Sequence, residues 1–594
     1  MITHSSMRHS WIIAVTSEPE AISRRVPANR KVVVRPFADG RTVVVATTPD
    51  VVVRENDGRI IVDPIRNVTI ASVDATIGRI RASRSLLSVP EVYWTDTGDN
   101  LLLAGSLADL LPHVGSRRLL ERSIVDHHIF RWSSGTRTYL EGVFHLLPGH
   151  ELQWNGQGSA TSRQIQSLRE FISEERRPVN RESASLQIEA LRRAMARHLE
   201  YTRSEDRAVL LSGGIDSSVM QMVIEGLDET SPLQTRSFIL ETPEWLEEEG
   251  YCREAVGIFG TQHEYIRISP ADYPALLVDT IATLGRPFGH DSQPASTGLF
   301  RALGAAGPTT LWSGEAADAI YGRTTVKPRY GHLPQPILWA LGIALQPFSP
   351  TKAQNARTTA QRMRAYLGGE TRPEHPTNTQ VRFCDLATVT RWFGERAVEE
   401  AMTERRNLAT LMAGPVSDIE RVHMLSLFTS ALYSASMDFQ VAAASGCTIL
   451  NPYVDEQVIR AVLRTNPEQR YFYKGRTKPL LKLALQERTG RDFIARPKRG
   501  GGFYTDLCEW MREGVLADLV RSIERPGYVD RKSFQQKIES PDWTTWNLLL
   551  MDLYMKHLRS LAAIQDGEPI SSDDALSANE LNRVAPRQHE LLVK

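Results

Sequence analysis

Cysteine is scarce in this sequence, and neither sign of charge is in excess. The four cysteines among 594 residues, Cys252, Cys384, Cys447 and Cys508, lie far apart and form no CxxC pair. This excludes a disulfide framework and a thiolate zinc site, so we expect buried thiols. Lysine plus arginine and aspartate plus glutamate each number 70, which gives a formal net charge of zero. Because proteins that bind duplex nucleic acid carry a basic excess, a nucleic acid is excluded as the main partner.

Long apolar runs are also missing. The longest, Ile337 to Leu345, has about half of the roughly 20 residues that a membrane-spanning helix needs. The first residues, MITHSSMRHSW, lack the apolar core and the small-residue cleavage site of a secretory signal. The sequence therefore predicts a cytoplasmic protein, and its length favours two large domains.

Short β-branched runs fill the first third of the chain. Five of them are bounded by Gly, Asp, Asn or Pro: KVVVRP from Lys31, TVVVATT from Thr42, GRIIVD from Gly58, EVYWT from Glu91 and NLLLA from Asn100. Runs of this kind are typical of strands. We therefore predict a sheet-rich domain over residues 1–165 and a charged linker over 166–183. DHH, from Asp126, has no ligand partner at metal-site spacing, so we interpret it as surface or core packing.

Residues 184–564 predict a second, α/β domain. Apolar residues recur at three- and four-residue spacing from Ile188 to Leu199, as in an amphipathic helix. Helical patterns then alternate with short apolar strands, as a parallel sheet requires: AVLL from Ala208, TRSFIL from Thr235 and TTLW from Thr309. From about Val381 onward the pattern is mostly helical, and the polar tail 565–594 is typical of disorder.

The stretch LLSGGIDSS, Leu210 to Ser218, leads from an apolar strand through a glycine turn into a helix. Backbone N–H groups and the helix dipole converge on an anion in such a turn. Gly213 and Gly214 let a phosphate approach the backbone, and the loop offers three hydroxyl donors, Ser212, Ser217 and Ser218. The order is neither that of a Walker P-loop nor GxGxxG. An ordinary strand-to-helix turn is the alternative, but the complete SGGxDS[ST] pattern favours phosphate binding.

This motif resembles the pyrophosphate loop of the ATP-pyrophosphatase superfamily, and it is most similar to the asparagine synthetase branch. In that branch the loop holds the β- and γ-phosphates of ATP while a carboxylate attacks the α-phosphate. The resemblance implies an ATP site that contains Leu210, Ser212, Gly213, Gly214, Asp216 and Ser217. It also implies that Asp216 is a Mg²⁺ ligand, which suits a hard cation that bridges phosphate oxygens.

Two later segments support the resemblance. LWSGEAADAIYG, from Leu311, resembles the SGExxD segment of the branch, which implies that Ser313 and Gly314 bind ATP and that Asp318 is the second Mg²⁺ ligand. Glu315, three residues before Asp318, shares a face with it if a helix starts here, and the resemblance implies that it orients the substrate or accepts a proton from the attacking amine. The alternative for both acids is capping of a helix N-terminus.

ARPKRGGGF, from Ala495, resembles the catalytic lysine loop of the same branch. The resemblance implies that Lys498 offsets negative charge in the transition state, whereas a solvated basic loop is the alternative. RTKPLLKLAL, from Arg476, and MDFQVAAASGCTILNPYVDEQVI, from Met437, resemble helices of the same domain. The second lacks the Glu and Arg of the branch's EARVPFLD pattern, which disfavours free aspartate as the substrate.

The first domain resembles a glutaminase that has lost its nucleophile. Residues 84–111 and 138–152 are similar to the closing parts of the glutaminase domain of asparagine synthetases, which implies a degenerate N-terminal-nucleophile sandwich with α+β architecture. Such a domain uses the thiol of an N-terminal cysteine. Here residue 2 is Ile2 and the first cysteine is Cys252, so we expect a scaffold that supplies no ammonia.

β-Lactam synthetases and lasso peptide macrolactam synthetases share this loss, and the chain most resembles the latter. That implies adenylation of an Asp or Glu side chain of a precursor peptide, ring closure by the peptide's N-terminal amine, and partners that include the precursor peptide, a leader peptidase and a leader-recognition protein. A cationic patch at Arg357, Arg362 and Arg364 is a candidate peptide contact or a solvated helix face. Two alternatives remain: a β-lactam-type or ammonia-dependent synthetase acting on a small molecule, and a non-catalytic ATP-binding scaffold.

Overall fold

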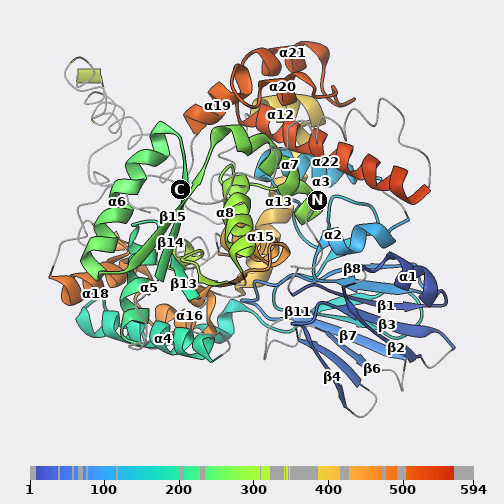
Figure 1. Cartoon of the computed structure of the whole chain (residues 1–594), viewed down its shortest axis with the longest axis horizontal. Coiled ribbons are helices and arrows are strands. Elements are labelled where there is room, and N and C mark those ends of the chain that lie inside the picture. The colour runs from blue at the N-terminus through green and yellow to red at the C-terminus, as the bar shows by residue number, and fades with distance from the viewer. Residues whose placement is uncertain are drawn as a thin grey trace.

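The computed structural model shows an antiparallel β-sandwich joined to an α/β unit that carries many helices (Figure 1). Apart from a few isolated positions, the described residues are 9–27, 29–37, 40–56, 59–63, 71–74, 78–115, 118–200, 207–227, 234–307, 309–321, 386–414, 427–470, 472–473, 476–490 and 504–566. The two parts lie at opposite sides of the view in Figure 1. Strands β1–β12 form the antiparallel sheets and β13–β17 the parallel sheet, so the sheet-rich part precedes the α/β part along the chain, as expected.

Two antiparallel sheets of six strands form the sandwich in the described part of the chain. The first has the order β10-β8-β9-β1-β3-β2, with β1 (Trp11–Thr16), β2 (Lys31–Pro36), β3 (Thr42–Thr47), β8 (Tyr93–Asp96), β9 (Leu101–Ala104) and β10 (Phe144–His145). The second has the order β12-β11-β7-β6-β5-β4, with β4 (Val52–Asn56), β5 (Arg59–Asp63), β6 (Ala71–Asp74), β7 (Arg79–Arg84), β11 (His150–Trp154) and β12 (Thr161–Gln164). All five predicted strands are confirmed.

The central strands of the first sheet, β9, β1 and β3, are buried on both faces, whereas the edge strand β2 is largely exposed. Val43 of β3 and Val62 of β5 belong to one apolar cluster, which fills the space between the two sheets. Val44 of β3 and Ile12 of β1 point to the other face and join the large core of the rest of the molecule. Because both faces are covered, β1 reads as a continuous apolar run rather than an alternating one.

A parallel sheet of five strands organises the second part, in the order β15-β14-β13-β16-β17. Its strands are β13 (Arg207–Leu210), β14 (Gln234–Leu240), β15 (Gln262–Ile268), β16 (Thr310–Trp312) and β17 (Thr448–Leu450). β13, β14 and β16 confirm the three predicted strands. From Leu386 onward the described residues are mostly helical, as expected, and β17 is an exception that the sequence did not signal because a run of three residues is too short.

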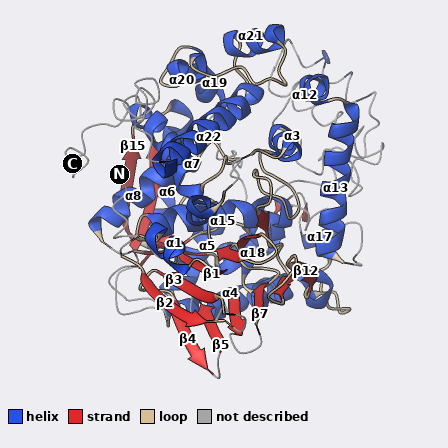
Figure 2. Cartoon of the chain, turned by 90° about the vertical axis from the view of Figure 1, so that its right-hand side faces the viewer, coloured by secondary structure: helices blue, strands red, loops and turns tan. Residues whose placement is uncertain are grey.

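Helices cover the parallel sheet and fill the space between it and the sandwich (Figure 2). The early helical segments are α1 (Pro19–Arg25), α2 (Leu107–Leu110), η2 (Leu111–His113), α3 (Glu121–Phe130), η3 (Leu168–Phe171), α4 (Arg181–Leu199), α5 (Ile215–Glu225), α6 (Pro243–Phe259), η5 (Pro270–Asp272), α7 (Tyr273–Leu284), α8 (Gln293–Ala306) and α9 (Ala317–Tyr321). Thus η3 and the start of α4 lie within the predicted linker.

The later segments include a short antiparallel hairpin, β18 (Phe472–Tyr473) and β19 (Arg476–Thr477). The helical segments there are α12 (Leu386–Phe393), α13 (Glu395–Ala413), the π-helix η8 (Leu427–Ala431), α15 (Leu432–Ala444), η9 (Pro452–Val454), α16 (Glu456–Leu463), α17 (Pro467–Arg470), α18 (Pro479–Thr489), α19 (Tyr504–Arg512), α20 (Ala517–Arg521), α21 (Arg531–Glu539) and α22 (Trp543–Asp566). None of the described helices is both long and apolar enough to cross a membrane.

Helix α3 carries the DHH stretch and packs against helices from the far end of the chain, α12, α13 and α22. Asp126, His127 and His128 are all fully buried. His127 Nδ1 lies 2.9 Å from Tyr139 Oη, and His128 Nε2 lies 3.0 Å from Tyr528 Oη. The interpretation as core packing is confirmed. The part of the chain that the structure describes contains no group of three or more metal-ligating His, Cys, Asp or Glu side chains.

Two of the cysteines are buried, and several other predicted features fall outside the described residues. Cys252 and Cys447 are buried as expected, whereas Cys508 is partly exposed because it lies on the half-buried side of α19. Other residues named in the predictions lie outside the described part of the chain: Cys384, the arginines Arg357, Arg362 and Arg364, the loop that contains Lys498, and the tail after Asp566.

Candidate active site

The glycine loop connects β13 to α5 at the carboxyl end of the parallel sheet. Gly213 has φ +67°, and a Cβ at this position would lie 2.4 Å from Tyr251 C and 2.5 Å from Cys252 N. Only glycine fits, because α6 passes directly beneath the turn. Gly214 has an ordinary φ of −75° and is exposed. The N-terminal N–H groups of α5 are therefore accessible to an anion.

Two of the three predicted hydroxyls lie at the loop. Ser217 Oγ accepts a hydrogen bond from Ser212 N–H at 3.2 Å and lies 3.3 Å from Ser212 Oγ. Ser218 is completely buried, so the expectation that its hydroxyl is a phosphate donor is wrong. It lies one residue further along α5, where the side chain faces the core. Leu210 ends β13 and is partly buried.

The second predicted segment reaches the same edge of the sheet. β16 runs parallel to β13 as its direct neighbour, which brings Ser313 and Gly314 beside the loop. A Cβ on Gly314 would lie 3.3 Å from Asp216 Cβ, so glycine allows the two segments to touch. Helix α9 begins only at Ala317. Glu315 therefore lies in the preceding turn, where its N–H donates to Ser313 Oγ at 3.2 Å, and does not share a helical face with Asp318.

Lys478 joins the two predicted Mg²⁺ ligands. Its ammonium donates to Asp216 Oδ2 and lies 2.6 Å from Asp318 Oδ1. Lys478 is 4 % exposed and has φ +52°, a left-handed conformation that is uncommon for a residue with a side chain. Burial alone lowers the pKa of Lys478, but the two carboxylates outweigh it and raise the pKa, so the ammonium stays charged at neutral pH.

The arrangement also fits a Mg²⁺ ion. Asp216 Oδ1 is buried and accepts no hydrogen bond from any residue that the structure describes. Two carboxylates that converge on one point, without a full cage of protein ligands, are typical of Mg²⁺ sites in which phosphate oxygens complete the coordination. Asp216 and Asp318 would therefore hold the ion, and its charge would offset that of the phosphates.

A second carboxylate pair lies next to this centre. Asp438 on α15 accepts a hydrogen bond from Gln293 Nε2 at 3.0 Å. Burial, followed by the nearby charge of Glu315, raises the pKa of Asp438 to about 7. A carboxylate with such a pKa is suited to accept a proton at neutral pH. Sequence reasoning overlooked Asp438, although it is the only charged residue of the apolar helix α15.

Lys478 is not among the predicted site residues, because the pattern RTKPLLKLAL indicates only a helix. The available signal was the position of this lysine immediately before Pro479, the first residue of α18. Lys498 lies outside the described residues, so its predicted catalytic role stays a prediction.

Comparison with known proteins addresses the second part of the chain. The sequence matches the protein family described as asparagine synthase over residues 188–559. This range is more than half of the chain, and it contains the glycine loop, Asp318, Asp438 and Lys478. No curated protein matches the sequence. The chain belongs to the asparagine synthase family, whose chemistry is ATP-dependent formation of amide bonds.

Proposed function

We propose that this protein is a macrolactam synthetase that uses ATP and releases AMP and pyrophosphate, of the kind that closes lasso peptides. The observation that carries the ATP chemistry is the convergence of the glycine loop, Asp216 and Asp318 on Lys478 at the carboxyl ends of β13 and β16. The proposed substrate is a precursor peptide. One of its Asp or Glu side chains is activated, and its own N-terminal amine is acylated.

In the first step, a peptide carboxylate oxygen attacks the α-phosphorus of ATP, and the bond to the β-phosphate oxygen breaks. The departing pyrophosphate is bound by the N–H groups of the loop around Gly214 and by the hydroxyls of Ser212 and Ser217. We expect Lys478, which is bound to Asp216 and Asp318, to offset the charge of the phosphates, and Lys498 to offset the charge that develops in the transition state.

In the second step, the amine attacks the carbonyl carbon of the acyl-adenylate, the bond to the AMP oxygen breaks, and the nitrogen loses a proton. We expect Asp438 or Glu315 to accept that proton, because the two carboxylates lie close enough for the charge of Glu315 to raise the pKa of Asp438. Holding both reacting ends of one peptide makes the step effectively unimolecular, which supplies much of its acceleration.

The sequence supports an amine carried by the substrate over ammonia. Residues 1–251 contain no cysteine, so the sandwich offers no thiol for glutamine hydrolysis. The segment after MDFQ also lacks the Glu and Arg of the aspartate-using branch. Both features favour a nucleophile that belongs to the substrate itself.

The test is pyrophosphate release by the purified protein with Mg²⁺-ATP. One arm contains a precursor peptide that has been cleaved to expose its N-terminal amine, and the other contains free aspartate plus ammonia. We expect release only with the peptide, together with a product lighter by one water. Release only with small amino acids would instead indicate a β-lactam-type or ammonia-dependent enzyme.

A second measurement examines the predicted catalytic lysine. Lys498→Ala should lower pyrophosphate release by about a hundredfold, since one lost electrostatic contact in a transition state costs about 10²–10³ in rate. Lys532→Met changes an exposed lysine of α21 and should leave the rate unchanged. Wild-type release by Lys498→Ala would remove that residue from the mechanism.

A further inference from the structure

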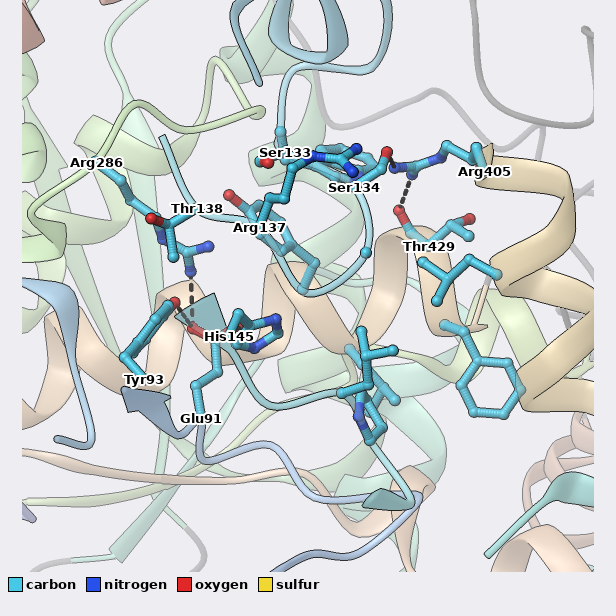
Figure 3. A pocket seen from close by; sticks show the side chains of 18 of the residues that line it. Glu91, Tyr93, Ser133, Ser134, Arg137, Thr138, His145, Arg286, Arg405 and Thr429 are labelled. Carbon is cyan, nitrogen blue, oxygen red and sulfur yellow. Dashed lines mark hydrogen bonds and ion pairs between the residues drawn. The ribbon is translucent and has the colours of Figure 1, made fainter. Parts of the chain in front are cut away.

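A buried carboxylate joins the sandwich to the α/β part of the molecule. Glu91 lies two residues before the start of β8 and is 2 % exposed. It lines a cavity of about 60 Å³ between the two parts, together with side chains from both of them. Figure 3 shows Glu91 at the lower edge of this cavity, with Tyr93 and His145 beside it and Arg286 above it. Burying a carboxylate costs free energy unless charged or hydrogen-bonding partners compensate it, so the partners of Glu91 show which segments it connects.

The partners of Glu91 come from both parts of the chain. From the sandwich, Tyr93 Oη donates to Glu91 Oε2 at 2.6 Å, and His145 Nε2 lies 3.2 Å from Oε1. From the α/β part, Arg286 Nη2 donates at 2.9 Å and Gln440 Nε2 donates at 2.6 Å, both to Oε2. Desolvation opposes the charged form, but Arg286 and His145 outweigh it and hold the pKa of Glu91 well below its usual range. The carboxylate therefore stays ionised.

The two α/β partners belong to the segments that surround Asp438. Gln440 lies two residues after Asp438 on α15, and a helix turns by about 100° per residue. Their side chains therefore lie on opposite sides of α15, one toward Glu91 and one toward Glu315. Arg286 lies near the start of the short connection from α7 to Gln293, the residue that donates to Asp438. Glu91 thus contacts the helix that carries Asp438, through Gln440. Through Arg286, it also contacts the segment that leads to Gln293, the hydrogen-bond donor of Asp438.

We propose that Glu91 is a positioning residue for amide formation, through which the sandwich fixes α15 and hence the Asp438 carboxylate. This inference rests on the proposed function, because it assigns Asp438 to the amide-forming step. It gives the sandwich a role that requires no glutaminase chemistry. The ATP-binding edge, with Gly213, Asp216 and Lys478, makes none of these contacts, so the first step does not depend on Glu91.

The test separates the two steps in the full-length protein. Glu91→Gln keeps the size of the side chain but removes the charge and places an amide N–H₂ among donors. Adenylation is measured by trapping the acyl-adenylate with hydroxylamine, and amide formation by the yield of ring-closed peptide. We expect amide formation to fall by about tenfold to a hundredfold, because a displacement of about 1 Å costs up to about 10² in rate. We expect trapping to remain within about twofold of wild type.

Two further variants distinguish positioning from a general loss of structure. Gln440→Met breaks the link from Glu91 to α15, together with the hydrogen bond from Gln440 Nε2 to Ser436 Oγ within that helix, and should reproduce the selective loss. In an Asp438→Asn background, Glu91→Gln should cause no additional loss of amide formation, since both changes act through one carboxylate. Equal losses in both steps, or effects of Glu91→Gln and Asp438→Asn that multiply, would show that Glu91 only stabilises the fold and would overturn the proposal.

A readout that needs no substrate keeps this result separate from the proposed function. Amide hydrogen exchange should accelerate in residues 432–444 of Glu91→Gln and stay unchanged in α5. Absence of pyrophosphate release by the wild-type protein with every substrate would refute the proposed function alone. Unchanged exchange in residues 432–444 would refute the positioning role, whatever the substrate is.

Discussion

In the absence of ATP and substrate, the free energy of unfolding of Lys478→Met should depend on Mg²⁺. The ammonium of Lys478 lies within 2.6 Å of Asp318 Oδ1 and also binds Asp216. Methionine keeps the length of the side chain and leaves two negative charges facing each other. Oxygens that share one hydrogen-bonded nitrogen are at most about 5 Å apart, so at an effective dielectric constant of about 20 their repulsion is about 3 kcal/mol.

Partial exposure reduces this figure. The side chains of Asp216 and Asp318 are 17 % and 31 % exposed, whereas that of Lys478 is 5 % exposed. Screening by water leaves an expected loss of about 1–2 kcal/mol in the free energy of unfolding. A saturating divalent cation should restore most of it, because Mg²⁺ then takes the place of the ammonium.

The assay is thermal and urea unfolding at pH 7, with EDTA and with millimolar Mg²⁺, for the wild type, Lys478→Met and the control Lys532→Met. The wild type and the control should respond little to Mg²⁺, and Lys478→Met should respond strongly. Its pyrophosphate release should fall by at least about tenfold, since a lost hydrogen bond to a charged group costs about 1.5–3 kcal/mol. Equal stability of Lys478→Met and the wild type in EDTA would refute this account of the site.

Three other outcomes follow from the same geometry. Gly213→Ala should destabilise the fold by about 2 kcal/mol or more in urea unfolding because its Cβ meets Tyr251 at 2.4 Å, whereas Gly214→Ala should keep its stability and weaken only ATP binding. EDTA should abolish pyrophosphate release by the wild type without changing its circular dichroism, because Lys478 still neutralises the aspartates. Since the folded-state pKa of Asp438 is raised to about 7, the folded protein binds the extra proton between about pH 4 and pH 7, and stability falls as pH rises through that window. In Asp438→Asn, the free energy of unfolding should decrease less between about pH 4 and pH 7 than in the wild type. The rate of amide formation should rise near pH 7 in the wild type and not in Asp438→Asn.

The glycine loop and both aspartates could be predicted because their signals are local. A strand, a glycine turn and a helix start lie within nine residues, and the positive φ of Gly213 already favours glycine before the contact with α6 is considered. Asp318 likewise follows a short strand whose carboxyl end must reach the same edge of a parallel sheet. Sequence patterns of this kind place residues at an edge of the sheet.

Lys478 and Asp438 could not be placed in this way, because their partners lie far away in the sequence. Lys478 meets Asp216 across 262 positions, and Gln293 meets Asp438 across 145. No periodicity encodes such a meeting, which depends on how helices pack. Ser218 shows the opposite error: the motif suggested a donor, but the turn of α5 directs its hydroxyl into the core.

The position of Glu91 in the chain has a consequence for synthesis on the ribosome. Gln440 lies 349 positions after Glu91, which at about 5–20 residues per second is about 20–70 s of translation. Arg286 follows Glu91 by 195 positions, so the buried carboxylate lacks both α/β partners for about the first 10–40 s and has only Arg286 until Gln440 is made. The first sheet also lacks the apolar surface that later covers its second face. The nascent sandwich therefore exposes an apolar sheet face until the rest of the chain is made. We expect residues 1–165 made alone to aggregate unless residues 184–566 are supplied in the same cell.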